Sequence, residues 1–132
     1  MNRKFLISAA VMFLMAWALG FLVHEGLLGA DYAKTAGMRP PAEAQRLMHF
    51  IILAHALFGA AFAWVYVQGR EAKPWLAQGV RYGIAVACLT VIPTYLIYHV
   101  VTPVPFDLAF KQIVFDTVRV VLMGIVLAWL NR

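Results

Sequence analysis

Residues 47–67 read LMHFIILAHALFGAAFAWVYV, a run of 21 residues without aspartate, glutamate, lysine or arginine. A helix needs ~20 apolar residues to cross the ~30 Å of hydrocarbon in a bilayer, so this run is long enough to span one. Three other runs, residues 5–23, 82–101 and 113–130, have similar length and apolar character. The sequence therefore predicts an all-α fold, an integral membrane four-helix bundle.

The composition of the whole chain agrees with a membrane protein. Of its 132 residues, 64% are hydrophobic and 13% are charged, whereas a soluble domain carries about 25% charged residues. The four runs leave only short connections, so residues 1–132 are predicted to form a single transmembrane domain without a soluble catalytic part. The net charge of +5 comes from basic residues scattered at the ends of the runs, which indicates a lipid bilayer rather than nucleic acid as partner.

The first apolar run requires a choice between a signal peptide and a retained helix. Two basic residues precede it, and Ala16-Trp17-Ala18 resembles the small-residue pattern of a cleavage site. The apolar residues continue to Val23, however, and the run is longer than the core of a usual signal peptide. We therefore expect a first membrane span that is retained.

The basic residues that flank the four runs predict the orientation of the bundle. Cytoplasmic loops of membrane proteins carry an excess of lysine and arginine. In an antiparallel up-and-down bundle, both termini and a hairpin at residues 68–79 fall on one side, and a loop at residues 24–46 falls on the other. The first side is richer in basic residues, so both termini are predicted to be cytoplasmic and the loop 24–46 external. The basic residues are Arg3, Lys4, Arg70, Lys73, Arg81 and Arg132 on the first side, and Lys34, Arg39, Arg46 and Lys111 on the second.

Glycine, proline and aspartate mark expected helix ends and interruptions. Gly69 is placed to end the second helix. Pro93 lies inside the third run, where a proline removes a backbone hydrogen bond and kinks a helix. Asp107 precedes the fourth run and is a plausible N-cap for the fourth helix.

Small residues recur at every fourth position in three of the runs. Helices in lipid pack most closely where such residues form a stripe, because the backbones can approach one another. Two of the stripes include a histidine, so we expect His24 and His55 to face the interior of the bundle rather than lipid. The three stripes are Ala16/Gly20/His24, His55/Gly59/Ala63 and Gly79/Gly83/Ala87.

Ionisable residues gather near one side of the predicted membrane. Such residues are costly in hydrocarbon and usually face the interior of a bundle. With the termini inside, the histidines, Asp116 and Arg119 lie within ~13 Å of the outer boundary, and Tyr95, Tyr98 and Gln112 lie at similar heights. The candidate site residues are His24, Glu25, His49, His55, His99, Asp116 and Arg119.

Asp116 and Arg119 are three residues apart and therefore share a helix face, where they can form an ion pair. A pair avoids two separate desolvation costs in the membrane. The pair has two interpretations. It holds the fourth helix in register, or it serves a substrate, a lipid or a proton, with Arg119 as a binder of an anionic or carboxylate group.

The four histidines allow a second chemistry. Each can form an ordinary hydrogen bond or meet interfacial water. Two histidines on facing helices can also ligate a b-type haem or, together with Glu25, a metal ion. His24, His49, His55 and His99 are therefore the candidate ligands for a haem or a metal, although no compact His-x-x-x-His pattern is present.

The chain resembles a group of small four-span inner-membrane proteins of bacteria to which no activity is assigned. The resemblance covers nearly the whole chain and implies the four-span fold and a location in the bacterial inner (cytoplasmic) membrane, without a mechanism. It rests on HEGLL at residues 24–28 followed by DY at 31–32, on GRE at 69–71, KPWL at 73–76 and QG at 78–79, on PTYLIY at 93–98 and on KQIVFD at 111–116.

Three functions remain open at this stage. A phosphate-binding glycine loop, a nucleophile elbow and a zinc-protease helix are all absent from the sequence, which favours a non-enzymatic role. The leading hypothesis is a non-catalytic accessory or interaction subunit, either a homo-oligomer or part of a larger membrane complex. The alternatives are a haem- or metal-binding redox protein that uses the histidines, and proton-linked transport or a small membrane enzyme that uses Asp116 and Arg119.

Overall fold

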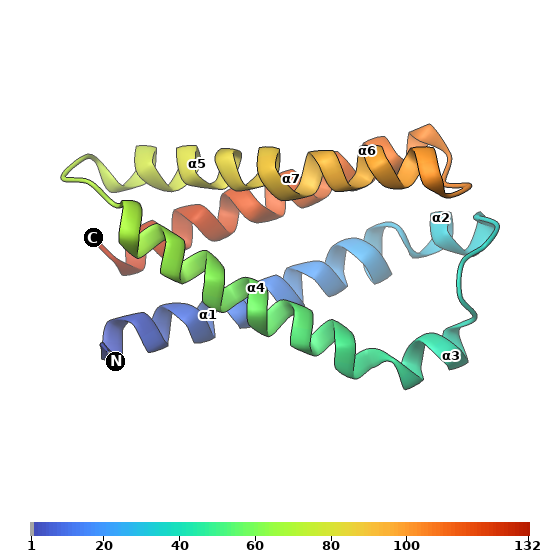
Figure 1. The fold of residues 1–132 in the computed structure, drawn as a ribbon, viewed down its shortest axis with the longest axis horizontal. Coiled ribbons are helices and arrows are strands. Elements are labelled where there is room, and N and C mark those ends of the chain that lie inside the picture. The colour runs from blue at the N-terminus through green and yellow to red at the C-terminus, as the bar shows by residue number, and fades with distance from the viewer. Residues whose placement is uncertain (1) are drawn as a thin grey trace.

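The computed structural model describes residues 2–132, and these residues form helices joined by short connections (Figure 1). Four helical segments are long and apolar enough to cross a membrane: Arg3–Leu27, Met48–Gly69, Trp75–Val101 and Phe106–Leu130. This result confirms the predicted all-α class and the presence of four helices that can span a bilayer.

Two of the four segments contain a π-helical turn. The first segment runs as α1, Arg3–Phe21, and continues as η1, Leu22–Leu27. The third segment consists of α5, η2 and α6 in turn. The bounds of those elements are Trp75–Val86, Ala87–Val91 and Ile92–Val101.

The other two long helices are regular, and two short helices lie in the connection between the first and second segments. The second segment is α4, Met48–Gly69, and the fourth is α7, Phe106–Leu130. The short helices are α2, Gly29–Lys34, and α3, Pro41–Arg46.

Local sequence explains several of the helix boundaries. The side chain of Asn2 accepts a hydrogen bond from the Lys4 amide at 3.0 Å and so caps α1. Pro93 is the second residue of α6 and cannot donate a backbone hydrogen bond, and the π-helical turn η2 lies immediately before α6. The predicted N-cap role of Asp107 is wrong, because α7 begins one residue earlier and Pro105 occupies the cap position. Asp107 instead lies in the first turn, where its charge favours the helix dipole.

The long helices pack as two pairs. Helix α1 packs mainly on α4, α5 packs mainly on α7, and α1 and α7 join the two pairs along the middle of the molecule. The contacts are close at glycines: a Cβ atom on Gly59 would lie 2.5 Å from Phe13 N, and one on Gly83 would lie 2.5 Å from Val121 Cα. These separations are too short for any side chain, so the predicted small-residue stripes do mark the packing faces.

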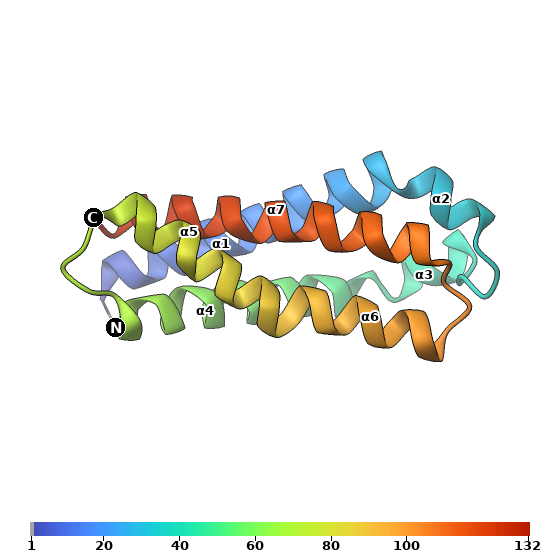
Figure 2. The same cartoon turned by 90° about the horizontal axis from the view of Figure 1, so that it is seen from above.

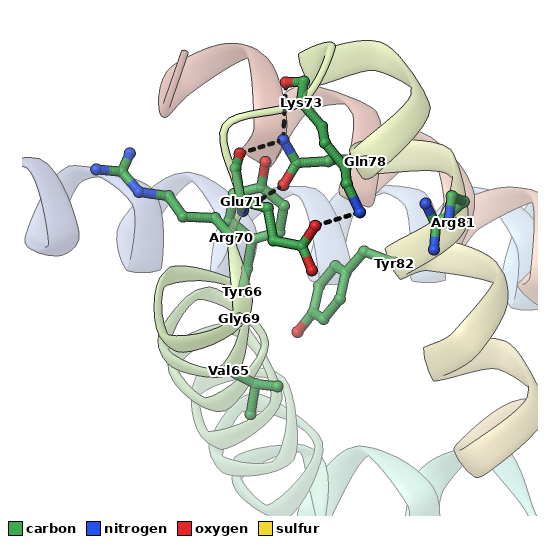
Figure 3. Close-up of a pocket in the computed structure, with 9 residues that line it drawn as sticks. All are labelled: Val65, Tyr66, Gly69, Arg70, Glu71, Lys73, Gln78, Arg81 and Tyr82. Atoms are coloured by element: carbon green, nitrogen blue, oxygen red, sulfur yellow. Dashed lines mark hydrogen bonds and ion pairs between the residues drawn. The ribbon is translucent and has the colours of Figure 1, made fainter.

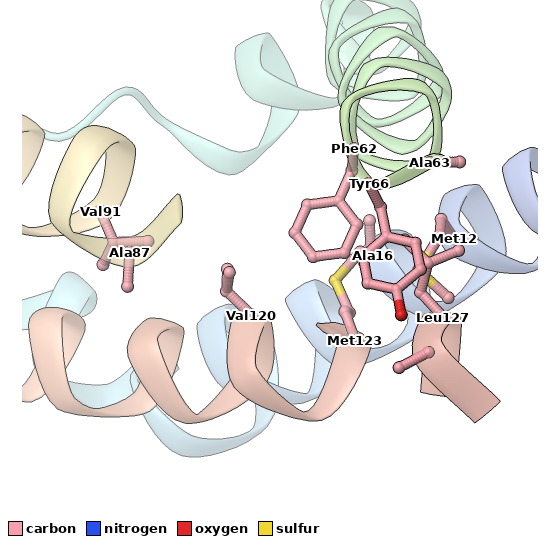
Figure 4. Packing of buried hydrophobic residues seen from close by; sticks show 11 residues of the cluster. Met12, Ala16, Phe62, Ala63, Tyr66, Ala87, Val91, Val120, Met123 and Leu127 are labelled. Carbon is pink, nitrogen blue, oxygen red and sulfur yellow. The ribbon is translucent and has the colours of Figure 1, made fainter. Parts of the chain in front are cut away.

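Buried apolar side chains from all four segments form one main cluster (Figure 4). Tyr82 adds a polar link within it, because its hydroxyl donates a hydrogen bond of 2.6 Å to the carbonyl oxygen of Phe62. This bond ties α4 to α5. The cluster contains Met12, Ala16, Phe62, Ala63, Tyr66, Ala87, Val91, Val120, Met123, Leu127 and Ala128.

Both chain termini and the loop between α4 and α5 lie at one end of the molecule, here called the terminal end (Figures 1 and 2). Lys4 Nζ donates to the carbonyl oxygen of Arg132 at 3.4 Å, and Arg70 donates to that of Asn131 at 2.8 Å. At the opposite, far end, α4 separates from α6, and residues 45–54 are all exposed. The bundle is therefore closed at the terminal end and open between α4 and α6 at the far end.

Candidate functional site

Asp116 on α7 is the centre of a polar cluster inside the bundle. Asp116 is 2% exposed, and polar groups from three segments of the chain lie close to its carboxylate. The Tyr95 hydroxyl of α6 donates a hydrogen bond to Oδ2, and His24 Nε2 of η1 lies 3.2 Å from the same oxygen. Arg119 Nε, one helical turn further along α7, lies 3.0 Å from Oδ1. The buried negative charge is thus compensated by a guanidinium and by two hydrogen-bond donors.

The two π-helical turns place the donors of this cluster. His24 lies within η1, whose backbone is closed by a bond of 2.9 Å from the Leu28 amide to the Val23 carbonyl. Tyr95 follows η2 by one helical turn. A π-helical turn contains one more residue than an α-helical turn, so it changes the direction in which the following side chains point. Such turns occur frequently at functional sites.

A second line of hydrogen bonds leads from His24 to the far end. Gln112 Nε2 donates to the Tyr32 oxygen at 3.0 Å, and the Tyr32 oxygen lies 2.6 Å from His24 Nδ1. If Nε2 of His24 carries the proton that faces Asp116, Nδ1 accepts the Tyr32 proton, and every donor then points toward the carboxylate. Burial raises the pKa of Tyr32 above its ordinary value of 10.0, which keeps its hydroxyl protonated.

Gly20 of α1 provides the space in which Arg119 and His55 meet. A Cβ atom on Gly20 would lie 2.7 Å from Arg119 Nη1 and 3.0 Å from His55 Nε2. The Nδ1 atom of His55 donates to the Ile51 carbonyl oxygen at 2.7 Å. Nε2 is therefore the acceptor nitrogen of the neutral ring, and it lies beside the guanidinium.

The cluster is not fully satisfied by hydrogen bonds. The Arg119 Nε–H group is not directed at Asp116 Oδ1, so their 3.0 Å contact is an ion pair rather than a hydrogen bond. Among residues 2–132, the guanidinium makes one hydrogen bond, of 3.4 Å, to the carbonyl oxygen of Ala16. Buried polar atoms nearly always have a partner, so these atoms are exceptions within the described chain. The buried side-chain atoms without a hydrogen bond within the described chain are Asp116 Oδ1, Thr117 Oγ1 and Arg119 Nε.

Two cavities lie on either side of the cluster, and Tyr95 lines both. The first, about 210 Å³, reaches Asp116 and Arg119 from the side and is called here the lateral cavity. The second, about 360 Å³, lies at the far end beside Tyr32 and Gln112 and is called the end cavity. The remaining lining residues of the lateral cavity are Phe58, Thr90, Val91, Thr94 and Val120.

The structure brings together His24, His55, Asp116 and Arg119 of the predicted site residues. The other three lie apart from Asp116: Glu25 is exposed, the His49 ring lies tilted against Phe50, and His99 Nδ1 donates to the Val104 carbonyl oxygen at 2.7 Å.

Tyr32 was not among the predicted site residues, and Tyr95 and Gln112 were predicted only to lie at a similar height. Gln112 carried a signal in the sequence, because it precedes Asp116 by one helical turn and therefore shares its face. Tyr32 carried none, since its position depends on the path of the connection between α1 and α4.

The histidines do not converge on a metal site in this structure. Within residues 2–132, no three side chains of His, Cys, Asp or Glu lie close enough to hold a metal ion together. Both ring nitrogens of His24 are already engaged, one by Tyr32 and one by Asp116. An axial bond from His24 to a haem would therefore require one of these contacts to break.

A different arrangement of polar groups occurs at the terminal end, around a cavity of about 220 Å³ (Figure 3). The Gln78 side chain donates to the carbonyl oxygens of Glu71 and Lys73, at 2.7 and 2.9 Å, and accepts from the Glu71 amide. The ammonium group of Lys73 pairs with the Glu71 carboxylate and lowers the pKa of Glu71. These contacts are local to the loop and account for its shape rather than for a chemical activity.

Comparison of the chain with protein-family models, with curated proteins and with solved structures found no match.

Proposed function

We propose that this chain is a multi-pass protein of the bacterial inner membrane, an antiparallel up-and-down bundle with both termini in the cytoplasm. The excess of lysine and arginine at the terminal end supports this orientation. The far end, with α2, α3 and the end cavity, then faces the outside of the cell. Asp116 and its partners accordingly lie in a part of the bundle that opens outward.

We propose further that the cluster around Asp116 is an acid–base site that binds a ligand and exchanges a proton with it, in a small membrane enzyme or a proton-linked transporter. The observation that supports this role is the lateral cavity, which is lined by the buried Asp116 and by Arg119, whose guanidinium makes a single long hydrogen bond within the described chain. An ion pair that only holds helices together has no need of a cavity at its charged atoms.

The geometry gives each residue a part in moving the proton. Tyr32 meets the end cavity, so it can receive a proton at its oxygen as it passes its own to His24 Nδ1. His24 then releases the Nε2 proton to the carboxylate of Asp116, which is one of the residues that line the lateral cavity. Tyr95 keeps the carboxylate in place, and Arg119 holds the ligand.

The test is which ring nitrogens of the histidines carry a proton, followed by nitrogen NMR of the purified protein. We expect His24 to carry a proton on Nε2, because Nδ1 accepts from Tyr32 and Nε2 faces Asp116. Asp116→Asn removes the carboxylate that Nε2 faces, so it should change the nitrogen signals of His24. His49, which is exposed, provides the control ring and should be unaffected.

The accessory or interaction subunit is the second candidate function. The exposed apolar side chains at the start of α4 favour it, because a partner helix can pack on them; Phe50 is 60% exposed and Leu53 is 53% exposed. If His24 carries no proton on Nε2, or if Asp116→Asn leaves its nitrogen signals unchanged, the line of donors does not reach the carboxylate and the accessory role becomes the better proposal.

A further inference from the structure

We infer that the ligand of this site is an uncharged, bilayer-soluble molecule with a carbonyl oxygen, which enters sideways between α4 and α6 and accepts hydrogen bonds from Arg119. This inference rests on the proposed function, since it names the chemical class of ligand for the same site. It is carried by the position of the lateral cavity, by the donors left free on Arg119 and by the net charge of the cluster.

The lateral cavity opens toward lipid rather than toward water. One wall is Phe58 of α4, and the other is formed by η2 and the start of α6, where Thr90 and Thr94 lie. Leu89, the neighbour of Thr90, is 78% exposed and therefore marks this side of the bundle as facing the hydrocarbon. A molecule that reaches the cavity from this side must be soluble in the bilayer.

The depth of the site supports lateral access. Arg119 lies 13 residues after the first residue of α7 and 11 residues before the last. At 1.5 Å per residue these intervals correspond to ~20 Å and ~16 Å, so the guanidinium is close to the middle of the helix. A hydrophilic ion would have to cross hydrocarbon to enter between α4 and α6, whereas an apolar molecule would not.

Arg119 needs an acceptor that the described chain does not supply. A guanidinium has five N–H donors, and within residues 2–132 its single hydrogen bond is the long one to Ala16. Nε is buried against Asp116 Oδ1 and is out of reach of a ligand, but the side chain is 14% exposed, so its terminal nitrogens are the donors that a ligand can reach. A carbonyl oxygen has two lone pairs and no proton of its own, so it matches a group that can only donate.

The charge of the cluster favours an uncharged ligand. Asp116 and Arg119 cancel each other, and His24 adds no charge in the tautomer whose Nδ1 accepts from Tyr32. An anionic head group would leave one negative charge without compensation in a medium of low dielectric constant. A carbonyl compound satisfies the free donors without adding a charge.

The experiment measures the binding of decylubiquinone, an uncharged dicarbonyl with an alkyl tail, to the full chain in lipid nanodiscs, with oleate as the anionic comparison. We expect the quinone to bind and oleate not to bind. Thr94→Phe should fill the lateral cavity and weaken quinone binding by ~10-fold or more, which corresponds to ~1.4 kcal/mol. Ile97→Phe, on the exposed side of the same helix, should leave binding unchanged.

A second variant separates binding from folding. Asp116→Asn combined with Arg119→Gln keeps the cluster neutral, so it avoids an unpaired buried charge, and it should fold yet lose quinone binding. Oleate binding that depends on Arg119 would overturn the uncharged class. The absence of quinone binding, in a protein whose His24 carries its proton on Nε2, would overturn this inference and leave the proposed function in place. Quinone binding with a His24 whose proton is not on Nε2 would instead contradict the proton exchange and support the inferred ligand class.

Discussion

Asp116 is held by donors from three segments of the chain, and one of these donors, His24, is itself positioned by further polar groups. His24 receives its orientation from Tyr32, and Tyr32 in turn accepts a hydrogen bond from Gln112. Gln112 and Asp116 lie on the same face of α7, so the line of bonds returns to the helix from which it started. A change at any of these residues should therefore affect the protonation of His24.

Tyr32 makes the stability of the protein sensitive to alkaline pH. Burial raises its pKa in the folded protein above the ordinary 10.0, so the unfolded chain loses this proton first as the pH rises. The contribution of Tyr32 to the free energy of unfolding is full below about pH 10 and decreases above it, toward the folded-state pKa. We expect Tyr32→Phe to lose less stability than the wild type between about pH 9 and pH 11.

Unfolding in mixed micelles at several pH values measures this effect. Tyr98→Phe is the matched control, because Tyr98 is 53% exposed and outside the hydrogen-bonded line. Tyr98→Phe should lose as much stability at alkaline pH as the wild type does. Equal losses of stability in the wild type and in Tyr32→Phe would show that Tyr32 ionises as easily in the folded protein as in the unfolded chain.

At the residue scale, the sequence predicts which ionisable groups lie inside the bundle but not which of them meet. The spacing of Asp116 and Arg119 is sufficient to predict their pairing, since both lie on one regular helix. The partnership of Asp116 with His24 and Tyr95 depends on two π-helical turns, which alter side-chain direction. Hydropathy has no feature that reveals such a turn, so these contacts could not be predicted.

At the scale of helices, the close contact between α5 and α7 depends on glycines. We expect Gly83→Ala to lower the free energy of unfolding by about 1–3 kcal/mol, because the added methyl group overlaps the α7 backbone at Val121. Gly69→Ala is the control, since a Cβ atom there meets nothing within 4 Å. Its effect should stay within about 0.5 kcal/mol.

Thermal or denaturant unfolding of both variants provides the measurement. A Gly83→Ala protein as stable as the wild type would mean that α5 and α7 can separate without cost. In that case the backbones of α5 and α7 would lie further apart at Gly83 than in this structure.

The apolar runs predict the helices themselves better than their ends. The first span was expected to end at residue 23, with His24 just outside, but η1 carries the helix to Leu27 and includes this histidine. The fourth span was expected at residues 113–130, whereas α7 begins at Phe106. A helix continues through polar residues whenever its backbone hydrogen bonds can form, so apolar length alone underestimates it.

At the scale of the whole molecule, orientation in the membrane can be tested by labelling. We expect Met38→Cys, at the far end, to react with a membrane-impermeant maleimide on intact spheroplasts in a Cys88→Ser background. Ala72→Cys, in the loop of the terminal end, should react only after the membrane is opened. The prediction follows from the excess of basic residues at the terminal end. The reverse pattern would place the end cavity in the cytoplasm.

Synthesis of this chain delivers its two helix pairs to the membrane one after the other. The pair α1 and α4 is complete before residue 70, whereas the pair α5–α7 follows from residue 75 onward. The nascent first pair therefore already contains His24 when the last span arrives with its aspartate and arginine. Insertion of that last span, which carries Asp116 and Arg119, then depends on a hydrogen-bonding partner made earlier, so a ribosome-bound chain that lacks His24 should integrate its fourth span less efficiently.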